Sequence, residues 1–149
     1  MPAVPDQKRI LERLAAAGLR PTRQRIGLSS LLFGSGHRHV TAEHLHGEAL
    51  ACGLRVSLAT VYNALHQMTG AGMLREVVVE AGRFYFDTNT SAHHHFFHEE
   101  SGLLTDVPGR AIHLEALLPP PPPGTRVKLV DVVIRLEKLP DEGQAVLQC

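Results

Sequence analysis

A run of histidines carries most of the chemistry that this sequence can offer. Residues 91–102 read SAHHHFFHEESG and hold His93, His94, His95 and His98, four of the ten histidines in the chain. Neutral imidazole nitrogens, together with carboxylates, suit first-row metals such as iron, manganese and zinc. In an extended segment residues i and i+2 face the same side, so His93 and His95 should point together and His94 away. The run is therefore a candidate metal site, haem anchor or polar loop.

The composition limits the classes of protein to consider. The chain has 149 residues, of which 44% are hydrophobic and 20% charged, as in an ordinary globular protein. Its two cysteines, Cys52 and Cys149, can form neither a disulfide framework nor a CxxC zinc site. No apolar run approaches the roughly 20 residues of a membrane helix, and the N-terminus lacks a signal peptide's hydrophobic region. We expect a cytoplasmic protein with no membrane partner.

The zero net charge of the chain hides an asymmetry between its halves. Residues 1–83 carry ten Lys and Arg against six Asp and Glu, whereas residues 84–149 carry five against nine. A basic half is what binding to a polyanion requires, because neutralised phosphates release their counterions. The same imbalance could also be no more than a solvated surface.

Hydrophobic spacing and capping residues predict four helices followed by a hairpin in the first half. The predicted helices cover residues 6–19, 22–33, 41–53 and 57–69, with Thr22, Thr41 and Ser57 as N-caps. The β-rich runs MLREVVVE and RFYFD, joined by Ala81-Gly82, predict a two-stranded hairpin. This order is typical of a winged helix, in which the last helix before the hairpin enters the major groove of DNA. A small helical bundle that ends in a hairpin is the alternative.

The second half reads as a smaller α/β unit. Residues 101–108 and 125–139 have strand-like patterns, and residues 111–118 can form a short helix that ends before Pro119–Pro123. The edge from Val127 to Leu136 is most simply satisfied by pairing across a two-fold dimer axis. We therefore expect an α/β (α+β) protein, with a winged-helix DNA-binding domain in residues 1–84 and a dimerisation and sensing domain in residues 85–149.

Several phrases of the first half resemble the DNA-binding domain of the ferric uptake regulator family. They are LRPTRQRIGLSSLLF, HVTAEHLHGEAL and, most strongly, SLATVYNALHQMTGAGMLRE. The resemblance implies a homodimer that binds double-stranded, palindromic, AT-rich DNA. It implies that Tyr62 contacts bases or the sugar-phosphate edge, that Arg20 approaches the minor groove, and that Arg23, Ser57 and Thr60 contact phosphates. Asn63, next to the tyrosine, is a further candidate at the DNA. Asn63 stands where members of the iron-responsive type commonly carry arginine, so a different operator preference is expected.

The same resemblance implies a metal site between the two domains. Its ligands would be a histidine before the VTAE phrase, a carboxylate after the wing, two residues of the histidine run and a carboxylate on the next strand. On this chain they are His39, Asp87, His93, His95 and Asp106. A second metal set of the family is poorly matched here, and only Asp131, His94 and His113 could contribute to it.

Two further features are similar to the iron response regulators, a subgroup of this family that senses iron through haem. The CxxC pairs are missing, and HHHFF is present. The likeness implies haem as a cofactor, held by His93, His94 and His95, and a haem-delivering enzyme as a possible partner. A haem mode based on a Cys-Pro motif is not open to this chain, because Cys52 is followed by Gly53.

The sequence leaves three hypotheses about the function of the protein. The leading one is a transcriptional regulator of iron homeostasis that responds to haem, a divalent metal or both. A peroxide-, manganese- or zinc-responsive repressor would share its fold and site. A small metal-dependent enzyme is the remote alternative, because no general base, nucleophile or glycine-rich phosphate loop is placed to serve one. We expect no enzymatic activity.

Overall fold

The computed structural model of the protein describes residues 7–108, 114 and 117–141. The chain divides into two compact units, the first ending at Ser91 and the second beginning at Ala92. In the described ranges no helix is both long and apolar enough to cross a membrane. Each unit has its own three-stranded sheet.

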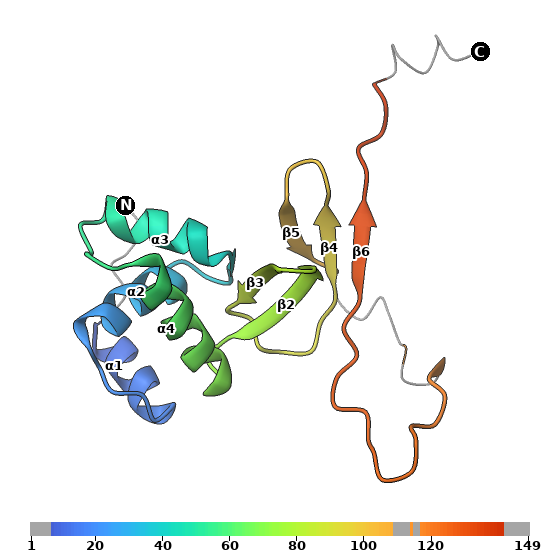
Figure 1. The fold of residues 1–149 in the computed structure, drawn as a ribbon, viewed down its shortest axis with the longest axis horizontal. Coiled ribbons are helices and arrows are strands. Elements are labelled where there is room, and N and C mark those ends of the chain that lie inside the picture. Colours follow the sequence, from blue (N-terminus) through green and yellow to red (C-terminus); the bar gives the residue numbers. More distant parts are fainter. Residues whose placement is uncertain (1–6, 109–113, 115–116, 142–149) are drawn as a thin grey trace. The chain divides into compact units, whose positions relative to one another are not determined.

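The first unit consists of helices followed by a small sheet (Figure 1). Its described elements are α1 (Gln7–Ala16), α2 (Arg23–Phe33), β1 (His39–Val40), α3 (Ala42–Ala51), α4 (Leu58–Gly70), β2 (Arg75–Glu80) and β3 (Arg83–Asp87). Strands β2 and β3 form the predicted hairpin, and Gly82 in its turn has a φ of 77°, which favours glycine. Strand β1 pairs antiparallel with the other edge of β3, so the sheet order is β1-β3-β2. The winged-helix architecture is confirmed.

Side-chain caps fix where three of the helices begin. The hydroxyl of Thr22 accepts from the backbone N–H of Arg25 at 3.2 Å and starts α2. Thr41 and Ser57 do the same for α3 and α4, each at 3.1 Å from the N–H three residues ahead. Each cap satisfies one of the N–H groups that a helix N-terminus leaves without an intrahelical partner. The predicted start positions are confirmed.

A single apolar core holds the first unit together. Leu28 and Leu32 of α2, Leu45 of α3 and Leu65 of α4 are fully buried and pack with Phe86 of β3. Leu28 and Leu32 are four residues apart, and Leu65 follows Val61 at the same spacing on α4, so the buried residues of each helix lie on one face. The core therefore fixes the helices against the sheet, and with them the residues expected at the DNA.

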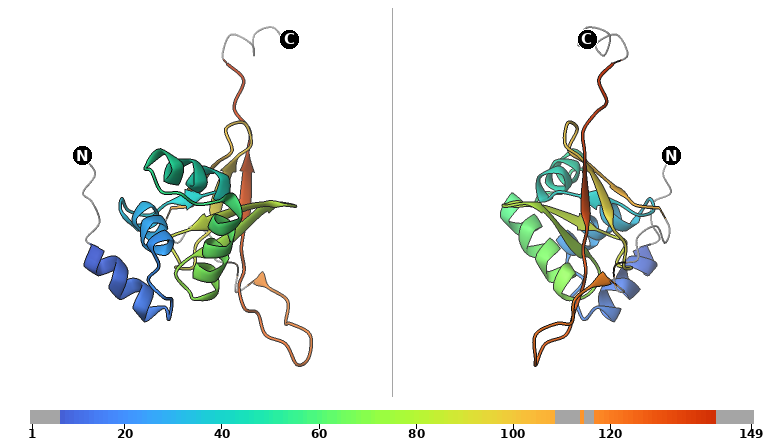
Figure 2. Two further views of the ribbon diagram at one scale, coloured as in Figure 1. Left: turned by 60° about the vertical axis from the view of Figure 1, so that its left-hand side comes forward. Right: turned by 90° about the vertical axis from the view of Figure 1, so that its right-hand side faces the viewer.

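The second unit contains a three-stranded sheet built around the histidine run. Strand β4 (His95–His98) pairs antiparallel with β5 (Leu103–Asp106) and parallel with β6 (Val133–Leu136). Phe97 and Leu104 face each other across β4 and β5 and are 1% and 3% exposed. Residues 117–132 lead into β6 as a loop outside the sheet (Figure 2). The histidine run is thus part of the central strand of this sheet.

The long strand predicted at residues 125–139 is wrong in its extent. Only Val133–Leu136 forms a strand there, while Val127 and Leu129 lie outside it and are 50% and 52% exposed. A strand persists only where a neighbour offers backbone partners, and β4 is four residues long. The alternating pattern overestimated the strand because it carries no information about the partner's length. The helix predicted at 111–118 lies mostly outside the described residues.

The histidine-rich strand β4 was not predicted, because imidazoles do not mark a strand by their hydrophobicity. The domain boundary also differs from the expected position. A boundary after residue 84 would cut β3, whereas the first unit continues to Ser91.

Truncating the core of the first unit should destabilise it strongly. We expect Leu65→Ala to lower the free energy of unfolding by about 2–5 kcal/mol, because it leaves a cavity among buried side chains. Leu50→Ala on α3 is the matched control, since Leu50 is 53% exposed and its loss should cost well under about 1 kcal/mol. Urea unfolding followed by circular dichroism measures both. Equal losses for the two variants would show that Leu65 does not lie at the centre of the core.

Candidate functional site

The pairing of β1 with β3 brings together the first group of possible metal ligands. His39 lies directly opposite Asp87 in this antiparallel pair, and His39 Nε2 is 3.1 Å from Asp87 Oδ2. The Asp87 side chain is fully buried, and its Oδ1 accepts from the backbone N–H of Asn89 at 2.9 Å. The carboxylate is thereby oriented with Oδ2 toward the imidazole. We call His39 and Asp87 the first ligand group.

Arg38 anchors the strand that carries His39. Its backbone N–H donates to Thr88 Oγ1 at 2.8 Å, and its backbone carbonyl accepts from the Thr88 N–H at 3.0 Å. Its guanidinium donates to both oxygens of Glu48 on α3 at 2.7 Å and to the carbonyl of Leu31 on α2 at 2.8 Å. One guanidinium nitrogen thus serves both carboxylate oxygens and another serves the carbonyl, and the contacts to the carboxylate are charge-assisted hydrogen bonds. The first ligand group is therefore tied to two helices of its own unit.

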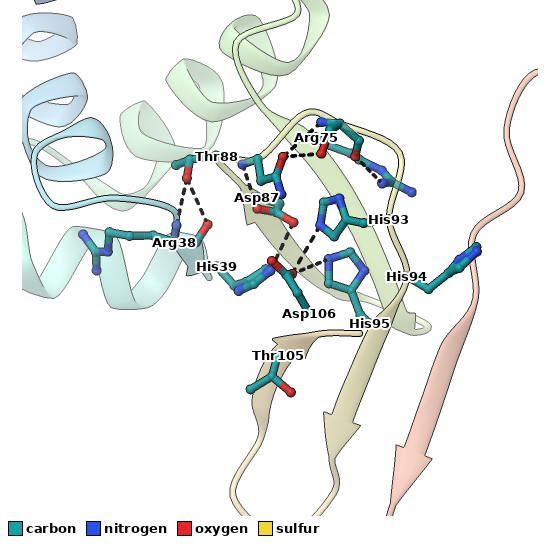
Figure 3. A network of polar contacts seen from close by, with 12 residues as sticks. Arg38, His39, Arg75, Asp87, Thr88, His93, His94, His95, Thr105 and Asp106 are labelled. Carbon is teal, nitrogen blue, oxygen red and sulfur yellow. Dashed lines mark hydrogen bonds and ion pairs between the residues drawn. The ribbon is translucent and has the colours of Figure 1, made fainter. Parts of the chain in front are cut away.

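The second ligand group comes from β5 and the start of β4. His93 Nε2 and His95 Nε2 lie 3.3 and 3.5 Å from the same oxygen, Oδ1 of Asp106 (Figure 3). The two imidazole rings are 4.4 Å apart between centroids, and His95 is fully buried. One ligand atom from each of the three residues lies within 4.8 Å of the others. Two imidazole nitrogens and a carboxylate oxygen at this spacing fit the donor set of a divalent first-row metal.

His94 faces away from this group, as the alternation of an extended chain predicts. Its Nδ1 accepts from the backbone N–H of Val132 at 3.2 Å, which places the ring proton of a neutral imidazole on Nε2. An iron atom could take Nε2 only after this hydrogen bond is broken and the proton moves. Of the poorly matched second metal set, His113 lies outside the described residues and Asp131 is exposed.

The residues expected at DNA lie in the first unit, around the N-termini of α2 and α4. Arg20, Arg23, Ser57 and Asn63 are exposed, whereas Thr60 and Tyr62 are half-buried. Ser57 Oγ lies 2.8 Å from Thr60 Oγ1 and also caps α4, so these two hydroxyls help to form the helix start. This position at the N-terminus of α4 is compatible with contacts from both hydroxyls to a phosphate.

A polar groove opens beside Arg23. It has a volume of about 580 Å³ and is lined by Thr22, Arg23, Gln24, Gly53, Leu54 and Arg55. Nearby, Arg25 is held in place, because its guanidinium donates to the carbonyl of Arg20 at 3.0 Å and to Gln67 Oε1 at 2.5 Å. Arg23 and Arg55, the two arginines that line this groove, suit an anionic ligand such as a phosphate.

Tyr62 has a partner that sequence reasoning missed. Its hydroxyl donates to Glu43 Oε1 on α3 at 2.6 Å. This hydrogen bond lowers the pKa of the Glu43 carboxyl below its usual value. The same bond is the main reason that the pKa of the Tyr62 hydroxyl is raised, with smaller contributions from burial and from the charge of Glu43.

No local signal could have revealed the partners Arg38, Glu48 and Glu43. Arg38 and Glu48 are 10 positions apart, and Glu43 and Tyr62 are 19 apart. Each pair meets only because the core orients the segments that carry its two residues.

Comparisons with known proteins agree with the fold and the motifs. The sequence model of the ferric uptake regulator family matches residues 16–116. The ferric uptake regulation protein of Shigella flexneri is 37% identical over 82 residues, which are 55% of this chain and 55% of that protein. The match thus spans about half the length of that relative.

Solved structures extend the likeness over most of the chain. The ferric uptake regulator of Vibrio cholerae has a TM-score of 0.70 at 22% identity, covering 85% of this chain and 98% of that one. The regulator of Pseudomonas aeruginosa, solved with manganese, has a TM-score of 0.65 at 24% identity, covering 87% and 97%. At these identities the likeness shows the fold, while the family model covers the greater part of the sequence. The chain belongs to the ferric uptake regulator family.

Proposed function

We propose that this protein is a dimeric, DNA-binding regulator of transcription whose activity depends on a divalent first-row metal. The observation that carries the proposal is the convergence of His93 and His95 on Asp106 in the second unit. It is supported by the facing pair of His39 and Asp87 in the first unit. A regulator of this kind would act in the cytoplasm and would have no enzymatic activity.

We further propose that one metal ion takes ligands from both groups. The first group offers two side chains and the second offers three, while first-row metals take about four to six donors in proteins. Neither group alone fills such a shell with side chains. An ion shared by both would favour the arrangement of the domains in which all five residues reach it, and would shift the population toward that arrangement. Its chemistry here would be coordination alone.

The proposed DNA contacts divide into two kinds. Arg23, Ser57 and Thr60 would position the protein on phosphates, and Arg20 would approach the minor groove. On α4, Asn63 would reach base edges, and Tyr62 would contact bases or the sugar-phosphate edge. The positive balance of the first half supports this assignment. Dimerisation through the second domain would place one reading helix on each half of a palindromic, AT-rich operator.

The finer identity of the effector is also a proposal. The missing CxxC pairs and the HHHFF phrase support a regulator of iron homeostasis of the iron response type, with haem as a further effector at His93, His94 and His95. The hydrogen bond at His94 Nδ1 and the burial of Phe97 work against haem in the described conformation. The divalent metal is therefore the effector that the geometry favours. Manganese is a suitable probe, because the Pseudomonas relative was solved with it.

Removing ligands of the second group should weaken metal binding selectively. We expect Asp106→Asn and His93→Ala each to raise the Kd for Mn²⁺ by at least about tenfold, because the first removes the charge of a carboxylate ligand and the second deletes an imidazole donor. His94→Ala is the matched control and should leave the Kd unchanged, since His94 faces Val132. Isothermal titration calorimetry on metal-free protein measures all three. A loss in His94→Ala as large as in Asp106→Asn would refute this ligand set.

His39→Ala tests whether the ion is shared between the domains. We expect this variant to raise the Kd for Mn²⁺ as strongly as His93→Ala does, and to weaken metal-dependent DNA binding in a mobility-shift assay. An unchanged Kd in His39→Ala, together with a loss in Asp106→Asn, would mean that the second domain holds the ion alone.

Arg23 should contribute to DNA binding through charge rather than sequence. We expect Arg23→Ala to weaken binding of the manganese-loaded protein to duplexes of any sequence. The slope of log K against log salt should fall by about one, because one phosphate contact is lost. Lys128→Ala in the second domain is the control and should keep the slope of the wild type. Fluorescence anisotropy over a range of salt concentrations measures the slopes, and equal slopes for the two variants would exclude Arg23 from the interface.

A further inference from the structure

Tyr62 lies on α4, the proposed reading helix, and its hydrogen bond to Glu43 limits the DNA groups that its hydroxyl can bind. The family resemblance assigns no role to Glu43. We propose that Glu43 is a specificity-determining residue. By taking the single proton of the Tyr62 hydroxyl, it makes the pair an acceptor for the amino groups of adenine or cytosine in the major groove. This inference rests on the proposed DNA-binding function.

The donor and acceptor roles follow from the chemistry of the two groups. A tyrosine hydroxyl has one proton and can accept as well as donate, whereas an ionised carboxylate can only accept. Tyr62 Oη lies 2.6 Å from Glu43 Oε1, so the proton lies between them and only lone pairs of Oη remain for a third group. The lowered pKa of Glu43 and the raised pKa of Tyr62 agree with an ionised carboxylate beside a neutral hydroxyl.

The position of Glu43 also favours its ionised form. Glu43 lies in the first turn of α3, where the partial positive charge of the helix N-terminus stabilises a carboxylate. Its side chain is exposed, and a hydrogen bond from its own backbone N–H further lowers the pKa of the carboxyl. The pair therefore presents lone pairs of both residues and no hydrogen-bond donor.

The ring of Tyr62 is oriented by its neighbours as well. It stacks on His66, one helical turn further along α4, with centroids 6.3 Å apart and planes 20° apart. His66 in turn meets the buried ring of Phe86 edge-on at 5.6 Å. Contacts at both the ring and the hydroxyl limit the rotamers of Tyr62, so the direction of its hydroxyl is set before DNA is bound.

The code of the major groove then selects the partner. Adenine N6 and cytosine N4 are the amino donors there, whereas guanine and thymine present carbonyl oxygens at the equivalent positions. Phosphate oxygens are acceptors too, and the negative charge of Glu43 disfavours them. Among the groups that DNA offers, a base amino group is the complement of this pair. The family resemblance implies that Tyr62 contacts either bases or the sugar-phosphate edge. The hydrogen bond to Glu43 favours the bases.

The test begins with duplexes that manganese-loaded wild-type protein selects from a random pool. In a selected duplex, each adenine is replaced in turn by purine and each cytosine by pyrimidin-2-one, which deletes one amino group at a time. We expect at least one such deletion to weaken wild-type binding by about tenfold. Tyr62→Phe, which lacks the hydroxyl, should be indifferent to the deletion at that position.

Glu43→Ala then tests the role of the carboxylate. In this variant the freed hydroxyl can donate to a carbonyl oxygen, so the preference for the amino base over its carbonyl counterpart should fall by about fivefold or more. The compared bases are adenine against guanine, or cytosine against thymine. Glu43→Gln, which removes the charge and keeps an amide of similar size, should show a smaller fall. Glu12→Ala on α1 is the matched control for loss of an exposed negative charge and should keep the wild-type preference.

The outcomes separate this inference from the proposed function. If the wild type selects no duplex, DNA binding fails and the inference fails with it. If it selects duplexes but no amino deletion costs affinity, or if Glu43→Ala keeps the wild-type preference, the inference alone is overturned. A thermal unfolding midpoint of Glu43→Ala equal to that of the wild type confirms that the fold is intact.

A tyrosine titration tests the hydrogen bond without DNA. The chain has two tyrosines, so Tyr85→Phe leaves Tyr62 as the only one. In this background, ultraviolet absorbance should show Tyr62 ionising at a higher pH with Glu43 present than in the Glu43→Ala variant. The reason is that the carboxylate stabilises the neutral hydroxyl. Identical midpoints would overturn the inference at its first step.

Discussion

The antiparallel register between β1 and β3 is the constraint on which the first unit depends. Two residue pairs define it, His39 with Asp87 and Val40 with Phe86. One pair places an imidazole against a carboxylate, and the other places two apolar side chains in the core. Because side chains alternate along a strand, a slip of one residue would move His39 and Val40 to the wrong faces together. Burial of Val40 therefore fixes the geometry of the first ligand group.

The same short strand connects this ligand group to α4, the proposed reading helix, by a continuous series of contacts. Arg38, next to His39, holds Glu48 on α3, and Glu43 on the same helix holds Tyr62 on α4. Each link is a hydrogen bond to a charged group, which is stronger and more directional than one between neutral groups. Within the first unit, a displacement of β1 would thus be resisted by both helices. This series of contacts makes the first unit rigid. Functional coupling between the ligand group and α4 would require in addition that the linked elements have two alternative arrangements.

Much of the first unit could be predicted from local sequence. The caps Thr22, Thr41 and Ser57 and the turn at Gly82 act over a few residues, so their signals survive in the sequence alone. The facing of His93 and His95 was likewise predictable, because it depends only on alternation along an extended chain. The extent of β6, the presence of β1 and the partners of Arg38 and Tyr62 depend on contacts between distant segments. Those features could not be predicted without a fold in which to place them.

The division of ligands between the two groups also has a thermodynamic consequence. In the proposed shared site, the three donors of the second unit would bind the ion first, and the two donors of the first unit would complete its coordination shell. Because the two units belong to one chain, binding of the held ion to the first unit would be an intramolecular step. Its effective concentration is set by the chain connection between the domains. The first unit ends at Ser91 and the second begins at Ala92, one residue before the ligand His93, so the chain connection next to the second ligand group is short. A short connection reduces the entropy lost when the two groups bind one ion. The proposed ion could therefore change the arrangement of the domains at a modest cost in free energy, as a reversible sensor requires.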